Sequence, residues 1–512
     1  MSMDKLLLGI DVGTSGTKTV LCAGDGTLLS SKTVDYPLSQ PQNGWAEQDP
    51  EDWWQAVLKG IRCVLKKSGE DPRRIAAVGL TGQMHGLIML DRDGAVLRPA
   101  ILWCDQRTER ECRRMEELAG RERILEITGS PAMTGFTASK ILWVKEHEPA
   151  LYARCAHILL PKDYIRYRLT GEFATDVSDA SGMQLLDIRT RRWSKELLSI
   201  FDIDASLLPA LYESAQESGR VSRKAADETG LVPGAIVAGG AADNAAAAVS
   251  AGVVKEGKAF TTIGSSAVIY AISDHVRVDP KGRVHGLCAA APGKWSVMSC
   301  TQAAGLSLKW LRDTCCAPET EQAQREGVDV YTLMDRLAEK IPIGAGNLIY
   351  LPYLMGERSP HPDPHCRGVF FGLSAMHTRA HLIRAVMEGV AFSQLSCLDV
   401  LRELELPVGE MTVCGGGAKS LLWRGMLTDL YGCPTDISLS DQGAAWGAAL
   451  LAAVSAGLYQ SVEQAVAATA RPGHSLSPDR ARHARYLPYY QLYLKLYDQL
   501  GGSFKALAGI EE

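Results

Sequence analysis

The segment from Gly9 to Lys18, GIDVGTSGTK, is the first that could do chemistry. Its glycines permit a tight turn that brings backbone N–H groups close to phosphate oxygens, and the hydroxyls of Thr14 and Ser15 add donors. Asp11 ends a short apolar run, where a carboxylate could hold Mg²⁺, usually through water. A plain hairpin explains the pattern equally well. No helix follows the glycines, so this is not a dinucleotide-binding fingerprint.

A second segment, GGAADN from Gly239 to Asn244, places the carboxylate of Asp243 at the junction of a predicted strand and an Ala-rich predicted helix. The positive N-terminal end of a helix keeps such a carboxylate ionised. An ionised carboxylate can accept the proton of an alcohol while the alcohol oxygen attacks a phosphate. Alternatively, Asp243 caps the helix and has no other task.

Polar side chains follow two further predicted strands. The loop Thr81–Gly86 contains His85, and a neutral histidine can hydrogen-bond a hydroxyl or a carbonyl group. A histidine that is satisfied inside the core is the alternative. The segment ILWCDQR offers more polar groups at a strand end, namely Trp103, Asp105 and Arg107.

Alternation of apolar residues predicts the elements that position these groups. Leu6–Asp11 and Lys18–Ala23 form a predicted hairpin, and a strand over Leu28–Val34 follows the next glycine turn. The acidic first turn at Asp49–Asp52 predicts the start of a helix. Ile75–Leu80 is a predicted buried strand, and strands and helices alternate beyond it, which favours an α/β fold.

Similar elements recur in the second half of the chain. Ala259–Ala271 is again a strand, a Gly-Ser turn and a strand, and Met411–Ser420 is a strand that runs into a glycine-rich turn before a helix. A length of 512 residues exceeds one ordinary core. The sequence therefore predicts two related domains, 1–248 and 249–512. We expect the ligands at the carboxyl ends of strands, in a cleft between the domains.

Composition excludes several classes of protein. A net charge of -5 lacks the basic field that gathers nucleic acid, and 13 cysteines without a C-x-x-C pair favour reduced thiols in a cytosolic enzyme. The N-terminal apolar run meets Asp11 too soon for a secretory signal, so we expect a cytoplasmic protein. The uncharged stretch Gly443–Tyr459 is rich in Gly and Ala, which predicts a helix packed closely on a sheet and no membrane span.

Two segments have the spacing of known motifs, a nucleotide-binding loop and a metal-binding histidine pair, but lack residues that those motifs require. Gly252–Lys258 has the spacing of a Walker A loop, but Ala259 stands where a metal-binding hydroxyl is needed. His377 and His381 lie four residues apart without the glutamate of zinc proteases, and prolines interrupt the segment His361–His365. A role at the start of a helix accounts for His381.

Taken together, these segments resemble the FGGY carbohydrate kinases of the actin–hexokinase–Hsp70 superfamily. GFTASKILWV, Gly135–Val144, is similar to the first family signature, and Gly368–Leu373 with His381–Glu388 is similar to the second. GWAEQDP, LLPKDYIRYRLTGEF and PYLMGERSPH are similar to family segments as well, so the resemblance covers nearly the whole chain. QMHG, Gln83–Gly86, is the feature typical of the members that phosphorylate D-xylulose.

The resemblance implies an α/β fold of two actin-like (ribonuclease H-like) domains with a cleft between them, the sugar on the N-terminal side and ATP on the C-terminal side. It implies transfer of a phosphoryl group from MgATP to a sugar hydroxyl, the 5-hydroxyl for D-xylulose, and suggests a homodimer. Asp243 would be the catalytic base and Asp11 the acid linked to Mg²⁺. The residues expected at the sugar are Met84, His85, Trp103, Asp105, Asp243 and Asn244, and those expected at ATP are Thr14, Ser15, Gly264, Ser265, Ser266, Gly415, Gly416 and Gly417.

Three departures from the family pattern leave the sugar open: GGAADN for GGGDN, GSSA at Gly264 for GTSG, and WCDQR at Trp103 for WNDGR. One alternative is a kinase for another ketose, a sugar acid or a polyol. A second is a catalytically silent actin-like binding or regulatory protein, against which the presence of both Asp11 and Asp243 argues. Release of ADP with and without sugar separates these classes.

Overall fold

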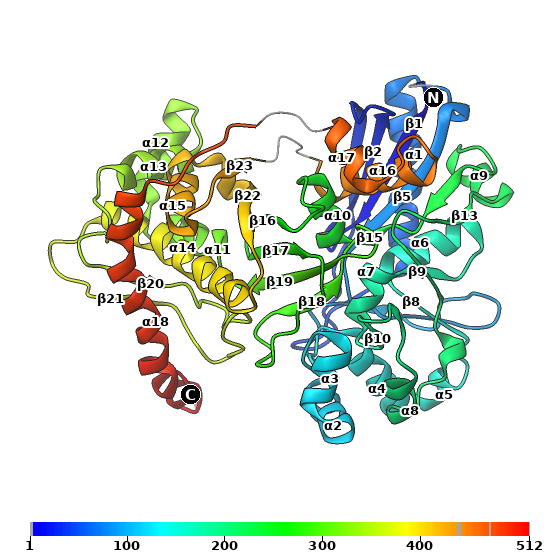
Figure 1. Cartoon of the computed structure of the whole chain (residues 1–512), viewed down its shortest axis with the longest axis horizontal. Helices are drawn as coiled ribbons and strands as arrows, with labels where there is room; N and C mark the ends of the chain where they lie inside the picture. Colours follow the sequence, from blue (N-terminus) through cyan, green and yellow to red (C-terminus); the bar gives the residue numbers. More distant parts are fainter. Residues whose placement is uncertain (1–3, 438–441, 470–472, 511–512) are drawn as a thin grey trace. The chain divides into compact units, whose positions relative to one another are not determined.

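The computed structural model describes residues 4–437, 442–469 and 473–510 (Figure 1). The chain forms two compact α/β units. The first unit comprises Met1–Lys255, Ile272–Ser296 and Ser440–Arg471, and the second comprises Glu256–Ala271, Val297–Leu439 and Pro472–Glu512. Two segments that follow residue 255 thus fold with the first unit.

The first unit contains a seven-stranded mixed sheet in the order β13-β14-β5-β1-β2-β3, with β15 also paired to β5. Strand β1 is antiparallel to β2 and parallel to β5. The predicted hairpin and third strand are confirmed, and the predicted strand at Ile75 continues to Gly82. The strands are β1 Leu6–Val12, β2 Gly16–Ala23, β3 Leu28–Asp35, β5 Ile75–Gly82, β13 Glu217–Arg220, β14 Ile236–Ala238 and β15 Ala241–Ala242.

Helix α1 (Pro50–Ser68) covers one face of this sheet. It begins as predicted, because the side chain of Asp49 accepts a hydrogen bond from the N–H of Glu51 at 2.9 Å. Its buried Trp53 shares a core with Leu8 and other alternate residues of β1. Since successive side chains of a strand point to opposite faces, Leu7 of β1 faces the other way.

Helix α16 (Gly443–Ser455) covers the opposite face. Ala445 and Ala449 share a second core with Leu7. The helix lies so close to the sheet that a Cβ added at Gly9 would be 1.9 Å from the carbonyl oxygen of Ala445. The helix packed closely on a sheet, predicted for this uncharged stretch, is confirmed.

Shorter elements complete the first unit. Those near the site are α4 Thr137–His147, α6 Pro161–Thr170, β9 Ala174–Asp176, α7 Val177–Ala180, α10 Asp243–Ser250 and β18 His285–Cys288. The others include β4 Glu47–Gln48, β6 Ile88–Leu90, β7 Ala100–Ile101, α2 Glu109–Ala119, α3 Arg121–Thr128, α5 Pro149–Tyr152, β8 His157–Leu159, β10 Leu186–Asp187, β11 Arg192–Trp193, α8 Lys195–Ile200, β12 Ala210–Tyr212, α9 Arg223–Thr229 and α17 Val462–Thr469.

The second unit repeats the central arrangement of the first. Strand β16 is antiparallel to β17 and parallel to β22, as β1 is to β2 and β5. The predicted strand–turn–strand at Ala259 and the strand before the glycine-rich turn are confirmed. The strands are β16 Gly257–Ile263, β17 Ala267–Ser273, β19 Trp295–Thr301, β20 Ile349–Leu351, β21 Val369–Phe371, β22 Val408–Cys414 and β23 Thr435–Ile437; the helices are α11 Gly305–Cys315, α12 Ala317–Glu326, α13 Val330–Glu339, α14 Arg379–Glu403, α15 Leu421–Tyr431 and α18 Arg480–Ala508.

The rejected motifs have structural explanations. Gly257 and Lys258 begin strand β16, so no helix follows the apparent Walker A loop. His381 closes a capping box at the start of α14, where its Nδ1 accepts the N–H of Thr378 at 3.2 Å. All thirteen cysteines are free thiols. Across the described ranges, no helix is both long and apolar enough to cross a membrane, and no three metal-ligating side chains gather.

Candidate active site

Three predicted site segments of the first unit meet at one edge of its sheet. Strands β1 and β15 both run parallel to β5, with Val12 and Ala242 each paired to Gly82. The carboxyl ends of parallel strands lie at the same edge. Asp11, the loop after Gly82 and Asp243 are therefore neighbours, although they are far apart in the sequence.

Asp243 is the first residue of α10, and Ala242 occupies the cap position. Its Oδ1 accepts the backbone N–H of Asn244 at 2.6 Å and the side-chain Nδ2 of Asn244 at 2.9 Å. Both bonds use the same oxygen, Oδ1. Burial, and after it the charge of Asp11, raise the pKa of Asp243 to about 7. A carboxylate with such a pKa is suited to general-base catalysis near neutral pH.

Asp11 supplies the second carboxylate. Burial raises its pKa to about 6, against the opposing charge of Lys18. Its Oδ1 is buried and makes no hydrogen bond within the part of the chain that the structure describes. An unpaired carboxylate oxygen beside a second carboxylate is an environment that a hard divalent cation would stabilise. The residues present therefore fit the metal that was expected at Asp11.

Met84 contacts Asn244, the residue after Asp243, and His85 follows Met84 in the same loop. The Nδ2 of Asn244 is 3.9 Å from the sulfur of Met84, so the QMHG loop and α10 are in contact. His85 has a φ of 69°, and its Nδ1 is 2.8 Å from the carbonyl oxygen of Gly182. Since a carbonyl can only accept, Nδ1 carries the proton in this bond, and a neutral ring would have its acceptor at Nε2. Gly182 is required there, because an added Cβ would be 2.5 Å from Nδ1.

The segment Gly135–Val144 supports the His85 loop, a role that the sequence did not indicate. Buried Lys140 donates from Nζ to the carbonyl oxygens of His85 and Gly135, both at 2.8 Å. The ring of Phe136 lies 4.0 Å from the ring of His85. Burial lowers the pKa of Lys140 to about 7. One signal was present: Lys140 is the one charged residue of the segment Gly135–Val144.

Thr14 and Trp103 are joined to Gln83 of the QMHG motif and to Gln48, which the sequence analysis did not select. Trp103 donates from Nε1 to the Thr14 hydroxyl at 2.9 Å, and that hydroxyl donates to Gln83 at 3.2 Å. The side chain of Gln48 donates to the Thr14 carbonyl at 2.8 Å. The Thr14 hydroxyl is thus engaged inside the loop, whereas Ser15 is exposed.

The structure does not bring the Asp105 carboxylate into this group. Asp105 is fully buried and accepts the backbone N–H of Ala46 at 2.7 Å. It also forms an ion pair with Arg107 at 2.7 Å, and the guanidinium of Arg107 lies 3.5 Å from the ring centroid of Trp45. Asp105 therefore holds the loop around Trp45 in place.

The expected ATP-binding residues of the second unit meet at one edge of its own sheet. The turn Gly264–Ser266 follows β16 and the turn Gly415–Gly417 follows β22, which is parallel to β16. The first N–H groups of α11 hold the former turn: Gly305 donates to the Gly264 carbonyl at 2.8 Å, and Leu306 donates to the Ser265 carbonyl at 3.1 Å. Both turns are accessible to a ligand, because Gly264, Ser265, Gly415 and Gly416 are exposed.

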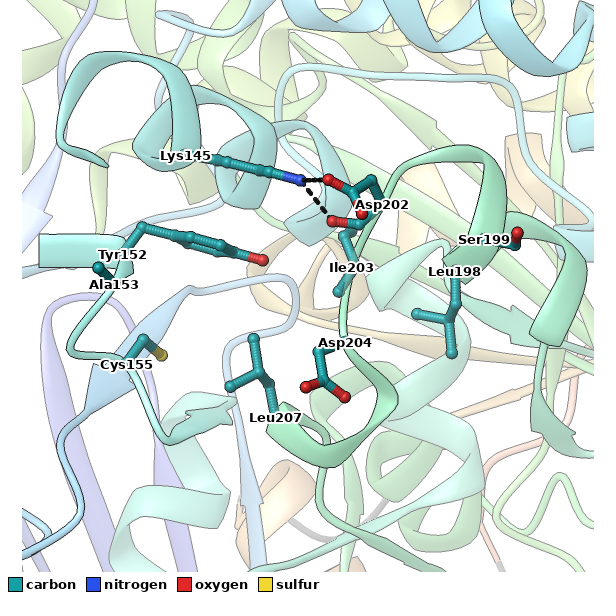
Figure 2. A pocket seen from close by; sticks show the side chains of 10 residues that line it. All are labelled: Lys145, Tyr152, Ala153, Cys155, Leu198, Ser199, Asp202, Ile203, Asp204 and Leu207. Atoms are coloured by element: carbon teal, nitrogen blue, oxygen red, sulfur yellow. Dashed lines mark hydrogen bonds and ion pairs between the residues drawn. The ribbon is translucent and has the colours of Figure 1, made fainter. Parts of the chain in front are cut away.

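A surface pocket of about 510 Å³ lies elsewhere on the first unit (Figure 2). Lys145 and Asp202 form an ion pair of 2.5 Å at its rim, and Tyr152, Ile203 and Leu207 contribute apolar surface. None of the predicted site residues lines it. The pocket is separate from the carboxylate pair.

Comparison with known proteins places this site in a class. The model of the N-terminal domain of the FGGY family of carbohydrate kinases matches residues 6–250, and the model of its C-terminal domain matches residues 259–456. A xylulose kinase of Bacillus subtilis is 38% identical over 96% of this chain and 97% of its own length. A xylulose kinase of Escherichia coli is 38% identical over 97% of this chain and 99% of its own length.

The fold agrees with these matches. The crystal structure of a xylulose kinase from Rhodospirillum rubrum superposes with a TM-score of 0.91, at 31% identity over 98% of this chain and 100% of that one. The family models and these relatives indicate a sugar phosphotransferase with a hydroxyl group as acceptor. The chain belongs to the FGGY family of carbohydrate kinases.

Proposed function

We propose that this protein phosphorylates D-xylulose on its 5-hydroxyl with ATP, in one in-line transfer without a covalent intermediate. The observation that carries the proposal is Asp243: a carboxylate with a pKa near 7 at the head of α10, joined through Asn244 to Met84 of the QMHG loop. The two xylulose kinases that are 38% identical over nearly the whole chain support this choice of sugar.

Asp243 acts as the general base. Asn244 holds Oδ1, and Oδ2 accepts the proton of the sugar hydroxyl as the hydroxyl oxygen attacks the terminal phosphorus of ATP. The proton moves to Asp243, the phosphoryl group moves to the sugar oxygen, and the bond to the β-phosphate oxygen breaks to release ADP. His85 orients the ketose by accepting a sugar hydroxyl at Nε2, while Lys140 fixes the backbone of His85.

Asp11 would hold Mg²⁺, mainly through water, because Mg²⁺ dehydrates reluctantly. Bound at the ATP phosphates, the ion would neutralise the charge that repels the attacking oxygen. The fit of Asp11 to this task rests on its buried Oδ1, which makes no hydrogen bond among the described residues.

The two domains divide the substrates. We assign the sugar to the N-terminal domain and ATP to the glycine turns of the C-terminal domain, at Gly264–Ser266 and Gly415–Gly417. Ser15 and the backbone of its turn would also face the phosphates. The boundary at residue 249, the homodimer and the cytoplasmic location stay predictions.

A panel of sugars tests the proposal, with ADP formation measured at saturating MgATP. D-xylulose should give the highest kcat/KM among D-xylulose, D-ribulose, L-ribulose, D-gluconate and glycerol. A higher kcat/KM for another sugar would support a sugar kinase but show that its preferred substrate is not D-xylulose. Absence of any sugar-dependent ADP formation would favour the silent binding protein.

A further inference from the structure

A buried ionic cluster is linked through Ser178 to β15, the short strand that precedes Asp243. Lys162 forms ion pairs with Asp163, Asp176 and Asp179 at 2.7, 2.9 and 3.2 Å, and all four side chains are fully buried. Lys162 comes from α6, and the aspartates come from α6, β9 and α7. Burying so many charges costs free energy unless their hydrogen bonds are well satisfied. Because such a cluster contributes little to stability, we looked for a role in its contacts with the segment that carries Asp243.

The cluster fixes the orientation of one hydroxyl. Asp176 accepts three hydrogen bonds at Oδ2: from the Ser178 backbone N–H at 2.9 Å, from the Ser178 hydroxyl at 2.6 Å, and from the Ser214 hydroxyl at 2.8 Å. Lys162 holds the other oxygen of Asp176. The proton of the Ser178 hydroxyl is therefore committed to Asp176, and its lone pairs point away from that carboxylate.

The Ser178 oxygen accepts the backbone N–H of Ala242 at 3.1 Å. Ala242 is buried, and it immediately precedes Asp243 at the start of α10. A neighbouring side chain, Arg166, donates to the carbonyl oxygens of Ala238 and Gly239 at 2.7 and 2.5 Å. Side chains from α6 and α7 thus hold the backbone on both sides of the turn that presents Asp243.

We propose that Ser178 is a positioning residue for Asp243: with its proton held by Asp176, its oxygen fixes the Ala242 amide and thereby the direction from which the Asp243 carboxylate meets the sugar hydroxyl. This inference rests on the proposed role of Asp243 as base. Misplacing a reacting group by about 1 Å can cost about 100-fold in rate, so one backbone anchor suffices to influence turnover.

Ser214 provides a matched control. It is buried, and its hydroxyl donates to the same Oδ2 of Asp176. Its own link to the turn is through its backbone carbonyl, which accepts the N–H of Gly240 at 2.9 Å and is kept in an alanine variant. Ser178→Ala and Ser214→Ala each remove one hydrogen bond from Asp176, and only the former removes the acceptor of the Ala242 amide. Loss of stability should be similar in both variants, whereas loss of catalysis should separate them.

The experiment measures kcat, both KM values and the melting temperature for the two alanine variants, with Asp243→Asn in parallel. Ser178→Ala should lower kcat by about 10-fold or more with little change in the KM of ATP, and Ser214→Ala should stay near wild type. Equal kcat losses in the two would overturn the proposal. If Ser178→Ala does not fold, Ser178→Cys, which keeps a weak acceptor, must still fall below Ser214→Ala. Full turnover in Asp243→Asn would instead reject the proposed base.

Discussion

The charge of Asp11 acts on the carboxylate of Asp243 across two parallel strand ends of one sheet. Burial comes first and the charge of Asp11 second among the causes that raise the pKa of Asp243 to about 7. Asp11 itself has a pKa of about 6. Of this pair, Asp11 loses its proton first as the pH rises, and Asp243 follows near neutrality.

The first prediction concerns the pH dependence of catalysis. Below its pKa, Asp243 carries a proton and cannot accept one from the sugar. We therefore expect the pH profile of kcat/KM for D-xylulose to bend near pH 7, the pKa of Asp243. Below that limb of the profile, kcat/KM should fall about tenfold for each pH unit. Asp11→Asn removes a nearby negative charge, so the limb should move to lower pH even though turnover is poor. A limb that stays in place in Asp11→Asn would contradict the coupling.

The second prediction is that Asp243→Asn loses activity and gains stability. Turnover should fall by at least about 100-fold, the lower range for loss of a general base. The folded pKa of Asp243 is about 7 and its ordinary value is 3.8. Between these values the folded state holds more protons than the unfolded state, so wild-type stability falls as pH rises through this window.

Asparagine cannot ionise, so the Asp243→Asn variant does not lose stability as the pH rises through this window. The melting temperature of Asp243→Asn minus that of wild type should therefore grow from pH 4 to pH 7 and then level off. Thermal denaturation across this range measures it. An equal difference at all pH values would show that Asp243 is not destabilised by ionisation in the folded state.

The third prediction separates the sugar site from the nucleotide site. His85→Ala removes a hydrogen bond in a polar site, worth about 1–3 kcal/mol, so the KM of D-xylulose should rise about 5- to 150-fold. The KM of ATP and any basal hydrolysis of ATP should change little. His147→Ala is the control, because His147 is an exposed histidine of the same unit. Parallel losses toward both substrates would make His85 a structural residue.

Local elements around the motifs could be predicted from the sequence because their signals are local. The hairpin of β1 and β2, the start of α1 at Asp49 and the strand–helix junction at Asp243 follow from alternation, turn residues and capping. The pairing of β1 with β5 in parallel then brings Asp11 and the QMHG loop together.

Partners distant in the sequence could not be predicted in the same way. An apolar pattern shows that a helix face is buried but not which sheet covers it. The packing of α16 on β1 could therefore not be predicted from the sequence. Asp105 looked like a sugar ligand by its place at a strand end, yet its carboxylate is engaged with Ala46 and Arg107. Ser178 and Lys140 gain their tasks only from tertiary contacts.

The last prediction tests Asp11 as the residue that favours the metal. Asp11→Ala should raise the Mg²⁺ concentration for half-maximal rate and lower kcat even at saturating metal, because the charge that attracts the ion is gone. Asp11→Asn keeps the shape of the side chain without its charge and should behave nearly as badly. Asp25→Asn is a matched control, since Asp25 lies in an exposed turn of the same sheet.

The measurement is a Mg²⁺ titration of initial rates for the three variants and wild type, at saturating ATP and D-xylulose. A carboxylate that acts through bound water contributes mainly by charge, so alanine and asparagine should give similar shifts. Because Asp11 Oδ1 is buried and makes no hydrogen bond to any residue that the structure describes, the neutral variants should also fold at least as stably as wild type. A wild-type metal dependence in Asp11→Asn would reject the metal role and leave Gly9–Lys18 as a hairpin turn.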